Sequence, residues 1–368
     1  MRSEHITRER AEGPIRATEA TRGAAPAGPS GAPAVWRGHE GVAAFAAALA
    51  ARLPPGRAAL LSGPADPDGD SIGSCLALGR ALELRGVRVT VVGRPGARYA
   101  GLPGAARMIP DPAVHEDVDL AIVLDGERGR LHAAVREVFD RAPERVLLDH
   151  HQSTATEGYT LALVAPASAS TAELVLGIID AWGIPLDPQL AAALFTGVIF
   201  DTGGFRHSNT SADTLRTAAR LVEQGIDHNA ITLKVLHERR PAGVAILARA
   251  LGSLQRPAPA LAVGLVKHAD LAETGAEYSD LEGVVDQLLH VEGVELAVLF
   301  IEREPGRLRL SLRSRRQVDC AALAQALDPV GGGHRRAAGC LLSGPPEMVL
   351  HVTIPALLAA VHAAMGRG

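Results

Sequence analysis

The sequence is poor in the residues on which several large classes of protein depend. Its 368 residues include 3 cysteines (Cys75, Cys320 and Cys340), too few and too scattered for a disulfide framework or a zinc finger. They suit a reducing compartment, so we expect a cytoplasmic protein. Aromatic residues make up 3% of the chain, which leaves few side chains on which the bases of a long single strand could stack.

Positive charge and long apolar runs are also scarce. The formal net charge is −4, so the chain lacks the overall basic field that drives tight binding to duplex nucleic acid. A small anionic substrate is still compatible with this charge, because a local site can be positive inside an acidic protein. No uninterrupted apolar run approaches the ~18 residues of a membrane-spanning helix, and the N-terminus lacks the apolar core of a secretion signal. We therefore expect no membrane contact.

The composition that remains is that of a folded protein with about two domains, since 47% of the residues are hydrophobic. Residues 1–35 mix charges, small residues and proline, and we expect a disordered tail there. A change from helical to strand-like residue patterns predicts a domain boundary near 240–258. The expected parts are a metal-binding domain over 36–240, a linker over 241–258 and a smaller domain over 259–368.

The spacing of apolar residues predicts strands that alternate with helices, followed by a run of helices. The expected strands of the first domain are 58–61, 87–92, 118–124 and 145–148. Its expected helices are 42–53, 72–84, 131–139, 171–182, 188–200, 211–223 and 229–236, and a further helix is expected at 242–251 within the linker. For the second domain we expect strands 261–266, 296–301 and 308–312, with helices near 281–290, 319–327 and 354–365. This order predicts two α/β domains, the first with a parallel sheet and the second with a smaller mixed sheet, and a cleft between them.

Acidic residues and histidines follow the predicted strands. They are Asp66, Asp68 and Asp70 in PADPDGD, Asp125 after VDLAIVL, Asp149, His150 and His151 in LLDHHQS, and Asp201 in FTGVIFDTGGF. The carboxyl ends of parallel strands lie on one edge of a sheet, so we expect these side chains to converge, all at strand ends. Several carboxylates in one place repel each other unless a cation intervenes, and carboxylate with imidazole suits an ion such as Mn²⁺. Taken singly, Asp70 before Ser71 could instead cap its helix.

A second pattern, GGGHRRAAG at 331–339, predicts an anion site. Its glycines let the backbone approach a ligand, and we expect AAG to begin a short helix whose N-terminus favours phosphate. In LSLRSR, Arg313 ends a predicted strand, where it could grip a phosphate with two hydrogen bonds. The expected substrate-binding residues are Arg206, Arg313, Ser314, Gly332, Gly333 and His334.

Five motifs together resemble those of the DHH family of phosphoesterases with a DHH-associated C-terminal domain. In chain order they are PDGDSIGS, AIVLDGE, LLDHHQS, TGVIFDTGGFR and GGGHRRAAG, and the resemblance spans roughly residues 40–345. The most similar subgroup hydrolyses short oligoribonucleotides and removes the 3′-phosphate of pAp. The resemblance therefore implies a phosphoesterase that takes short RNA or nucleotides, uses two Mn²⁺ ions or alternatively Mg²⁺, and forms a homodimer.

The resemblance also implies a role for each matched position. Asp68 would bind the first metal and Asp70 the second, and Asp125 would bridge them. His150 and Asp201 would complete the second metal. The catalytic pair would be His151, near the scissile phosphate as an acid or phosphate partner, and Asp149, which would orient its neighbours.

One position departs from the family. A histidine normally stands three residues before the proline of PDGD and binds the first metal, but here the residue is Pro64, which cannot ligate. Asp66 is a candidate replacement because an oxygen ligand also suits Mn²⁺; otherwise the first metal is weak or absent. Two alternatives to the oligoribonuclease stay open: a cyclic or linear dinucleotide phosphodiesterase, and a nucleotide-binding protein that has lost catalysis.

Overall fold

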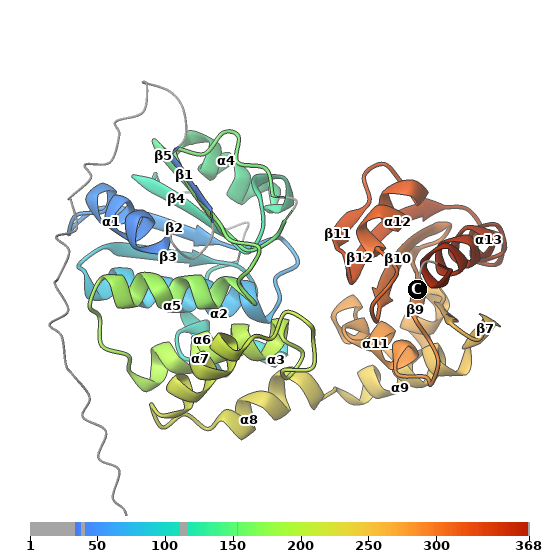
Figure 1. Ribbon diagram of the computed structural model, residues 1–368. Coiled ribbons are helices and arrows are strands. Elements are labelled where there is room, and N and C mark those ends of the chain that lie inside the picture. The colour runs from blue at the N-terminus through green and yellow to red at the C-terminus, as the bar shows by residue number, and fades with distance from the viewer. Residues whose placement is uncertain (1–33, 38–40, 111–116, 153, 367–368) are drawn as a thin grey trace, which may run out of the picture. The chain divides into compact units, whose positions relative to one another are not determined.

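The computed structural model describes residues 34–37, 41–110, 117–152 and 154–366. Most of the tail expected at 1–35 lies outside the described residues. From residue 34 onward the described residues belong to one compact unit, built on two sheets (Figure 1). The expectation of two α/β domains is confirmed, while the cleft expected between them stays a prediction.

The first sheet has six parallel strands in the order β1-β6-β5-β4-β2-β3. The strands are β1 (Ala34–Arg37), β2 (Ala58–Ser62), β3 (Arg88–Val92), β4 (Leu120–Leu124), β5 (Glu144–Asp149) and β6 (Leu161–Val164). Within β4, Leu120 and Ile122 contribute to one core cluster, while Ala121 and Val123 contribute to another on the opposite face. Both faces are therefore buried, which explains why the central strands are continuous apolar runs rather than alternating ones.

Helices cover both faces of this sheet (Figure 1). The helices of this domain are α1 (Val42–Arg52), α2 (Gly69–Leu84), α3 (Gly96–Tyr99), α4 (Ala133–Arg141), α5 (Thr171–Ala181), α6 (Pro188–Asp201), α7 (Ala212–Val222) and α8 (His228–Thr232). Helix α8 continues into a π-helical turn, η5 (Leu233–His237). Helices α1, α2 and α5 share a core with one face, and α4 covers the other. Helix α6 packs against α2 and α5 from outside, so α2 is enclosed by the sheet on one side and by α6 on the other.

Helices α2 and α6 approach each other closely because glycines face the contact. A Cβ added to Gly73 would lie 2.3 Å from the carbonyl oxygen of Ala193. A Cβ on Gly197 would lie 2.5 Å from Oδ1 of Asp70 and 2.6 Å from Cβ of Ala172. The helix contact therefore also sets the position of the Asp70 carboxylate.

Replacing Gly73 with alanine should force α2 and α6 apart, since the obstructing atom is backbone and cannot rotate away. We expect the free energy of unfolding, measured by urea denaturation, to fall by about 1–3 kcal/mol. The matched control is Gly252→Ala at the end of α9 (Pro241–Gly252), where no described atom beyond the helix lies within 4 Å of the added Cβ. Equal stability of Gly73→Ala and the wild type would contradict the close contact.

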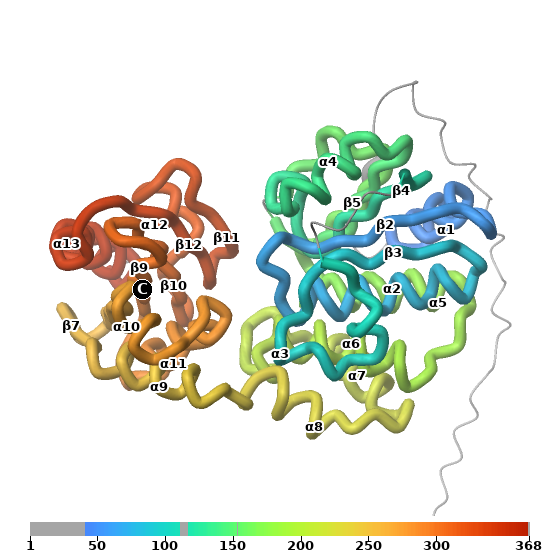
Figure 2. The backbone as a smooth tube through the Cα atoms, turned by 180° about the vertical axis from the view of Figure 1, so that it is seen from behind, coloured from blue at the N-terminus to red at the C-terminus, as the bar shows by residue number. Residues whose placement is uncertain are grey.

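The second sheet, five of whose strands are labelled in Figure 2, is mixed, in the order β11-β12-β10-β9-β8-β7; β8 and β9 are parallel and the other pairs antiparallel. Its strands are β7 (Gln255–Ala258), β8 (Leu261–Val266), β9 (Leu296–Glu304), β10 (Arg307–Ser314), β11 (Gly332–His334) and β12 (Ala337–Ser343). Its helices are α9, α10 (His268–Thr274), α11 (Val284–Leu289), α12 (Cys320–Leu327) and α13 (Pro346–Met365). Helices α12 and α13 pack on one face, and α9 and α11 on the other.

One expectation for this half of the chain is wrong. The sequence AAG at 337–339 does not begin a helix, because it opens strand β12, which pairs with β11 in a hairpin and with β10 on its other side. The stretch 241–258, expected to be a linker that contains a helix at 242–251, forms α9 and β7. Ile246 and Ala250 of α9 are buried in the core of the second domain. We propose that the domain boundary lies near residue 240, ahead of α9.

Helix α13 is long and apolar enough to cross a membrane by length and composition alone. The sequence analysis found no membrane-spanning run here because Pro355 and two histidines interrupt the apolar residues of this helix. One face of the helix, with Val349, Leu357 and Val361, is buried in the core of the second domain. A core helix of a folded domain passes the same test of length and composition, so this helix is weak evidence for a membrane span.

Candidate active site

Three neighbouring strands of the first sheet, β2, β4 and β5, end at the place where the acidic residues gather. Asp125 directly follows β4, Asp149 is the last residue of β5, and Asp70 lies in the first turn of α2 after β2. The predicted convergence at strand ends therefore occurs for these three residues. Asp201 is different, because it is the last residue of helix α6 and not a strand end; it reaches the same place because α6 packs on α2.

Asp70 is fully buried and holds the N-terminus of α5. Its two carboxylate oxygens accept hydrogen bonds from the backbone N–H groups of Thr171 (2.6 Å) and Ala172 (3.0 Å), and Ser74 donates to it at 3.2 Å. Burial and then the charge of Asp201 raise the pKa of Asp70 to about 8. A carboxylate in such a position is expensive to keep charged unless a cation lies beside it.

Asp125 sits in a strained backbone conformation. Its φ is 58°, a left-handed value that is uncommon for a residue other than glycine, and such strain clusters at functional sites. Its Oδ1 accepts a hydrogen bond from Oγ1 of Thr171 at 3.2 Å. Burial and the charge of Asp70 raise the pKa of Asp125 to about 7.

His150 presents a nitrogen to the carboxylates. Its Nδ1 lies 3.2 Å from the carbonyl oxygen of Ser168, which can only accept, so Nδ1 carries a proton. Its Nε2 lies 2.9 Å from Oδ2 of Asp201 and 3.6 Å from Oδ1 of Asp125. This buried Nε2 has no partner with hydrogen-bond geometry among the described residues. Burial works against the charge of His150, yet the nearby carboxylates outweigh it and raise the pKa well above its usual value.

Asp149 ties the two histidines of the DHH sequence together. Its Oδ1 accepts from the backbone N–H of His150 (2.8 Å) and from Nδ1 of His151 (2.7 Å), and its Oδ2 accepts from the hydroxyl of Thr154. Although burial opposes the charge, these donors lower the pKa of Asp149 to about 2. The carboxylate therefore stays charged and fixes the ring of His151.

Asp68 has a structural role at the start of helix α2. Its Oδ1 accepts from the N–H groups of Asp70 and Ser71, both at 3.1 Å, so Asp68 and not Asp70 caps helix α2. Burial and the charges of Asp125 and Asp201 raise the pKa of Asp68 to about 7. Asp66 is exposed, and the groups of ligand atoms found among the described residues do not include it.

The residues present fit a divalent cation. Asp70, Asp125 and His150 each offer a ligand atom, and these atoms lie within 4.8 Å of one another. Nε2 of His150 lies close to two carboxylates without hydrogen-bond geometry, and Asp70 and Asp125 have raised pKa values; a bound cation would offset this concentration of negative charge. Oxygen and imidazole ligands suit first-row divalent ions and do not by themselves identify the ion.

The hairpin of the second domain brings a further histidine to this group. The ring of His334 in β11 stacks on that of His151, with centroids 4.3 Å apart and planes inclined by 19°. Burial and the two neighbouring histidines lower the pKa of His334 to about 4, so its ring is neutral. Gly333 has a φ of 140°, and a Cβ there would lie 2.5 Å from the carbonyl oxygen of Ala337, so only glycine fits this turn.

The other residues expected to bind substrate form contacts with their own neighbours in the structure. Arg313 in β10 lies 3.3 Å from Asp286 through Nε, and its Nη1 donates to the carbonyl of Leu312. The hydroxyl of Ser314 donates to the carbonyl of Val318 at 2.7 Å. Arg206 is exposed after α6, with its Nε bonded to the carbonyl of Gly203.

Several site residues escaped the sequence analysis. Thr171 contacts both Asp70 and Asp125, the carbonyl of Ser168 orients His150, and Thr154 supports Asp149. A signal existed for the first of these, because Ser170 before Thr171 is a typical N-cap residue, and a helix N-terminus favours carboxylates. Thr154 and the backbone of Ser168 carry no comparable signal.

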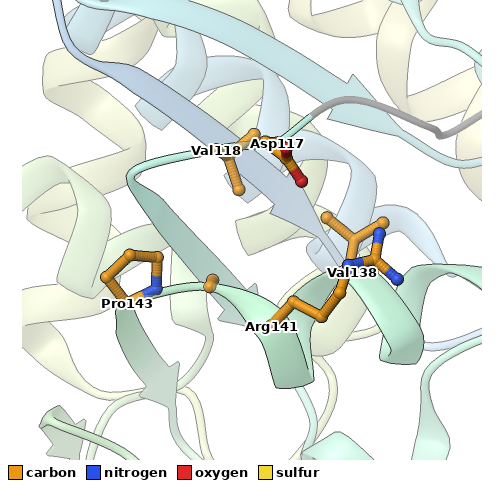
Figure 3. Close-up of a pocket in the computed structure, with 6 residues that line it drawn as sticks. Asp117, Val118, Val138, Arg141 and Pro143 are labelled. Atoms are coloured by element: carbon orange, nitrogen blue, oxygen red, sulfur yellow. The ribbon is translucent and has the colours of Figure 1, made fainter.

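The surface pocket in Figure 3 is not part of this site. It holds about 200 Å³ and is lined by Asp117 and Val118, which precede β4, and by Val138, Arg141 and Pro143 at the end of α4 and beyond. It therefore lies at the amino end of β4, opposite the carboxylates at the carboxyl end.

Comparison with known proteins identifies the family of this chain. Residues 60–198 match the N-terminal domain of the DHH family, and residues 261–365 match the DHHA1 domain. The chain is 31% identical over 287 residues to the bifunctional oligoribonuclease and PAP phosphatase NrnA of Thermus thermophilus, covering 76% of this chain and 82% of that protein. It is 25% identical to the cyclic-di-AMP phosphodiesterase PdeA of Listeria monocytogenes, over 73% of this chain and 42% of that protein.

A solved structure supports the fold. An exopolyphosphatase-related protein from Bacteroides fragilis superposes with a TM-score of 0.77 at 22% identity, covering 86% of this chain and 96% of that one. With both domains matched in order and a relative above 30% identity over most of its length, this chain belongs to the DHH family and carries a DHHA1 domain.

Proposed function

We propose that this protein hydrolyses short oligoribonucleotides to mononucleotides and removes the 3′-phosphate of pAp. It is a hydrolase of phosphoester bonds, as the DHH family and the relation to NrnA indicate. The observation that carries the proposal is the buried group of Asp70, Asp125 and His150, in which Nε2 of His150 faces the carboxylates of Asp125 and Asp201. On this proposal, the protein acts in the cytoplasm.

The proposed cofactor is Mn²⁺, held by Asp70, Asp125, His150 and Asp201. When bound, such an ion polarises a phosphoryl oxygen and makes a water molecule nucleophilic near neutral pH. Asp70 and Asp125 supply negative charge without moving, because backbone and hydroxyl donors fix their carboxylates.

His151 is the proposed proton carrier. Its Nδ1 is committed to Asp149 at 2.7 Å, which leaves Nε2 to hold a proton for the leaving 3′-oxygen. Burial opposes its charge, but the contact with Asp149 and the charge of Asp125 raise the pKa of His151. A protonated ring near neutral pH is what an acid at this position requires.

The proposed substrate contacts come from the second domain and from the turn after α6. Arg313, Ser314, Gly332, Gly333 and His334 would bind the end of the nucleotide, and Arg206 its other phosphate. His334 offers a flat neutral ring rather than a charge, since its pKa is lowered to about 4 by burial and its neighbours.

The test is release of mononucleotide from a 5′-labelled RNA dinucleotide, and of phosphate from pAp, with Mn²⁺ and with EDTA. We expect turnover on both substrates that EDTA stops. Linear and cyclic di-AMP serve as competing substrates, because the relation to PdeA favours a dinucleotide phosphodiesterase as the second candidate. A folded protein that binds pAp but hydrolyses none of the four would contradict the proposal and favour a protein that has lost catalysis.

A further inference from the structure

Thr171, the first residue of helix α5, contacts two carboxylates of the site through two different groups. Its backbone N–H donates to Oδ2 of Asp70 at 2.6 Å, and its hydroxyl donates to Oδ1 of Asp125 at 3.2 Å. Asp70 belongs to α2 and Asp125 follows β4, so a single residue links carboxylates that come from two separate elements. Thr171 is fully buried, so bulk water does not compete for these contacts.

The place of Thr171 in its helix leaves the hydroxyl available for Asp125. Inside a helix, a threonine hydroxyl often bonds to the carbonyl four residues earlier, as Thr196 of α6 does with Ala192 at 2.9 Å. Thr171 is the first helical residue, so no helical carbonyl lies four residues before it. Its hydroxyl donates instead to a carboxylate that is 46 residues away in the sequence.

The first turn of α5 is itself held in a fixed position. The carboxylate of Asp70 accepts from the N–H groups of Thr171 and Ala172, and Ser170 caps the helix through its hydroxyl. A Cβ added to Gly197 of α6 would lie 2.6 Å from Cβ of Ala172, so α6 packs directly against this turn. Helix α5 also runs alongside α2 (Figure 1). The hydroxyl of Thr171 is therefore presented by a rigid turn.

Asp125 is a residue that needs such support. Its φ of 58° is a strained value, and strain of this kind persists only where the surrounding structure holds it. Its backbone N–H donates to the carbonyl of Leu148 at 3.0 Å, which fixes the main chain. The side chain is held by the hydroxyl of Thr171 at 3.2 Å, whereas the nearest nitrogens of His150 and His151 lie farther from it, at 3.6 and 3.7 Å.

We propose that Thr171 is a positioning residue that fixes the carboxylates of Asp70 and Asp125 relative to each other, and that its hydroxyl thereby sets the affinity of the site for a divalent cation. The inference rests on the proposed function, in which both carboxylates hold the cation. Groups that orient the ligands of a metal contribute strongly to its affinity. Without the hydroxyl, the carboxylate of Asp125 would gain rotational freedom that binding would have to remove.

The test is the affinity of the metal-free protein for Mn²⁺, measured by isothermal titration. Thr171→Val keeps the backbone N–H and the size of the side chain but removes the hydroxyl, and it should weaken binding on the order of 10- to 100-fold. Thr171→Ser keeps the hydroxyl and should bind Mn²⁺ as the wild type does. The matched control is Thr196→Val, which removes an equally buried hydroxyl that bonds within its own helix and should leave the affinity unchanged.

Urea unfolding in EDTA shows whether each variant is folded. Thr171→Ala is a second variant without the hydroxyl; it places no additional methyl group beside the carboxylate and should lose affinity in the same range as Thr171→Val. Unchanged affinity in these two variants, or an equal loss in Thr171→Ser or in Thr196→Val, would overturn the proposal.

The titration also separates this inference from the proposed function, because it is read without turnover. A wild type that binds Mn²⁺ but hydrolyses neither the RNA dinucleotide nor pAp contradicts the proposed function alone. A wild type without affinity for Mn²⁺ would overturn both.

Discussion

Asp125→Asn should abolish metal-dependent hydrolysis, lowering kcat/KM for the RNA dinucleotide by about 10³-fold or more. The side chain lies at the centre of the site: its Oδ1 is 3.6 Å from Nε2 of His150 and 3.7 Å from Nδ1 of His151. Asparagine keeps the shape and can still accept from Thr171, but it removes the charge that holds the cation. The loss should therefore appear in Mn²⁺ affinity as well as in turnover.

The control for this variant is Asp213→Asn on α7, which removes one carboxylate that is 90% exposed from the same domain. It should leave kcat/KM unchanged. The free energy of unfolding separates loss of function from loss of fold: without metal, Asp125→Asn should be no less stable than the wild type, since the charge of Asp125 raises the pKa of Asp68 and so opposes folding at neutral pH. Full turnover in Asp125→Asn would contradict the assignment of the site.

The sheet of the first domain could be predicted from the sequence because its signal is local. The strand expected at 145–148 is β5, and the one at 118–124 contains β4, since both are short apolar runs that end in acidic residues. Parallel order then determines that their carboxyl ends meet. Strand β6 at Leu161–Val164 was missed, because four residues without alternation carry little periodicity.

The hairpin of β11 and β12 shows where local reasoning fails. Ala337–Ser343 contains alanine, leucine and glycine, which favour no strand by propensity. The segment is a strand because β10 pairs with it through seven consecutive residues, a contact between distant parts of the chain. Asp201 was named from its motif but expected at a strand end; it reaches the carboxylates from the end of α6, through the packing of α6 on α2.

The residues of the site also fall into two groups: those that the local sequence predicts and those that depend on how distant parts of the chain pack. The residues at strand ends, such as Asp125 and His150, could be named from the sequence. The carbonyl of Ser168 and the hydroxyl of Thr154 could not, because each reaches the site through the path of a loop that no local pattern reveals. Asp68 was identified as a candidate, but its use as the cap of α2 depends on the geometry of one turn.

Stability without metal should fall as the pH rises from about 4 to about 8, and Mn²⁺ should restore it. Folding raises the pKa values of Asp70 and Asp125 from 3.8 to about 8 and about 7, so the folded state binds more protons than the unfolded state across this window. The raised pKa of His150 acts in the same direction above its usual value of 6.5. Asp149 does not oppose this trend, because its pKa is lowered to about 2 and its contribution is complete above about pH 4.

A bound cation takes the place of those protons, so its effect should grow with pH. At about 100 times its dissociation constant, Mn²⁺ should raise Tm by about 5–10 °C near pH 8. The rise should be below about 2 °C near pH 5, where protons compete for the same carboxylates. The measurement is thermal unfolding with Mn²⁺ and with EDTA at both pH values, with Asp125→Asn expected to show little shift at either. An equal shift at both pH values would mean that the ion binds groups that do not titrate between them, and therefore not Asp70, Asp125 and His150.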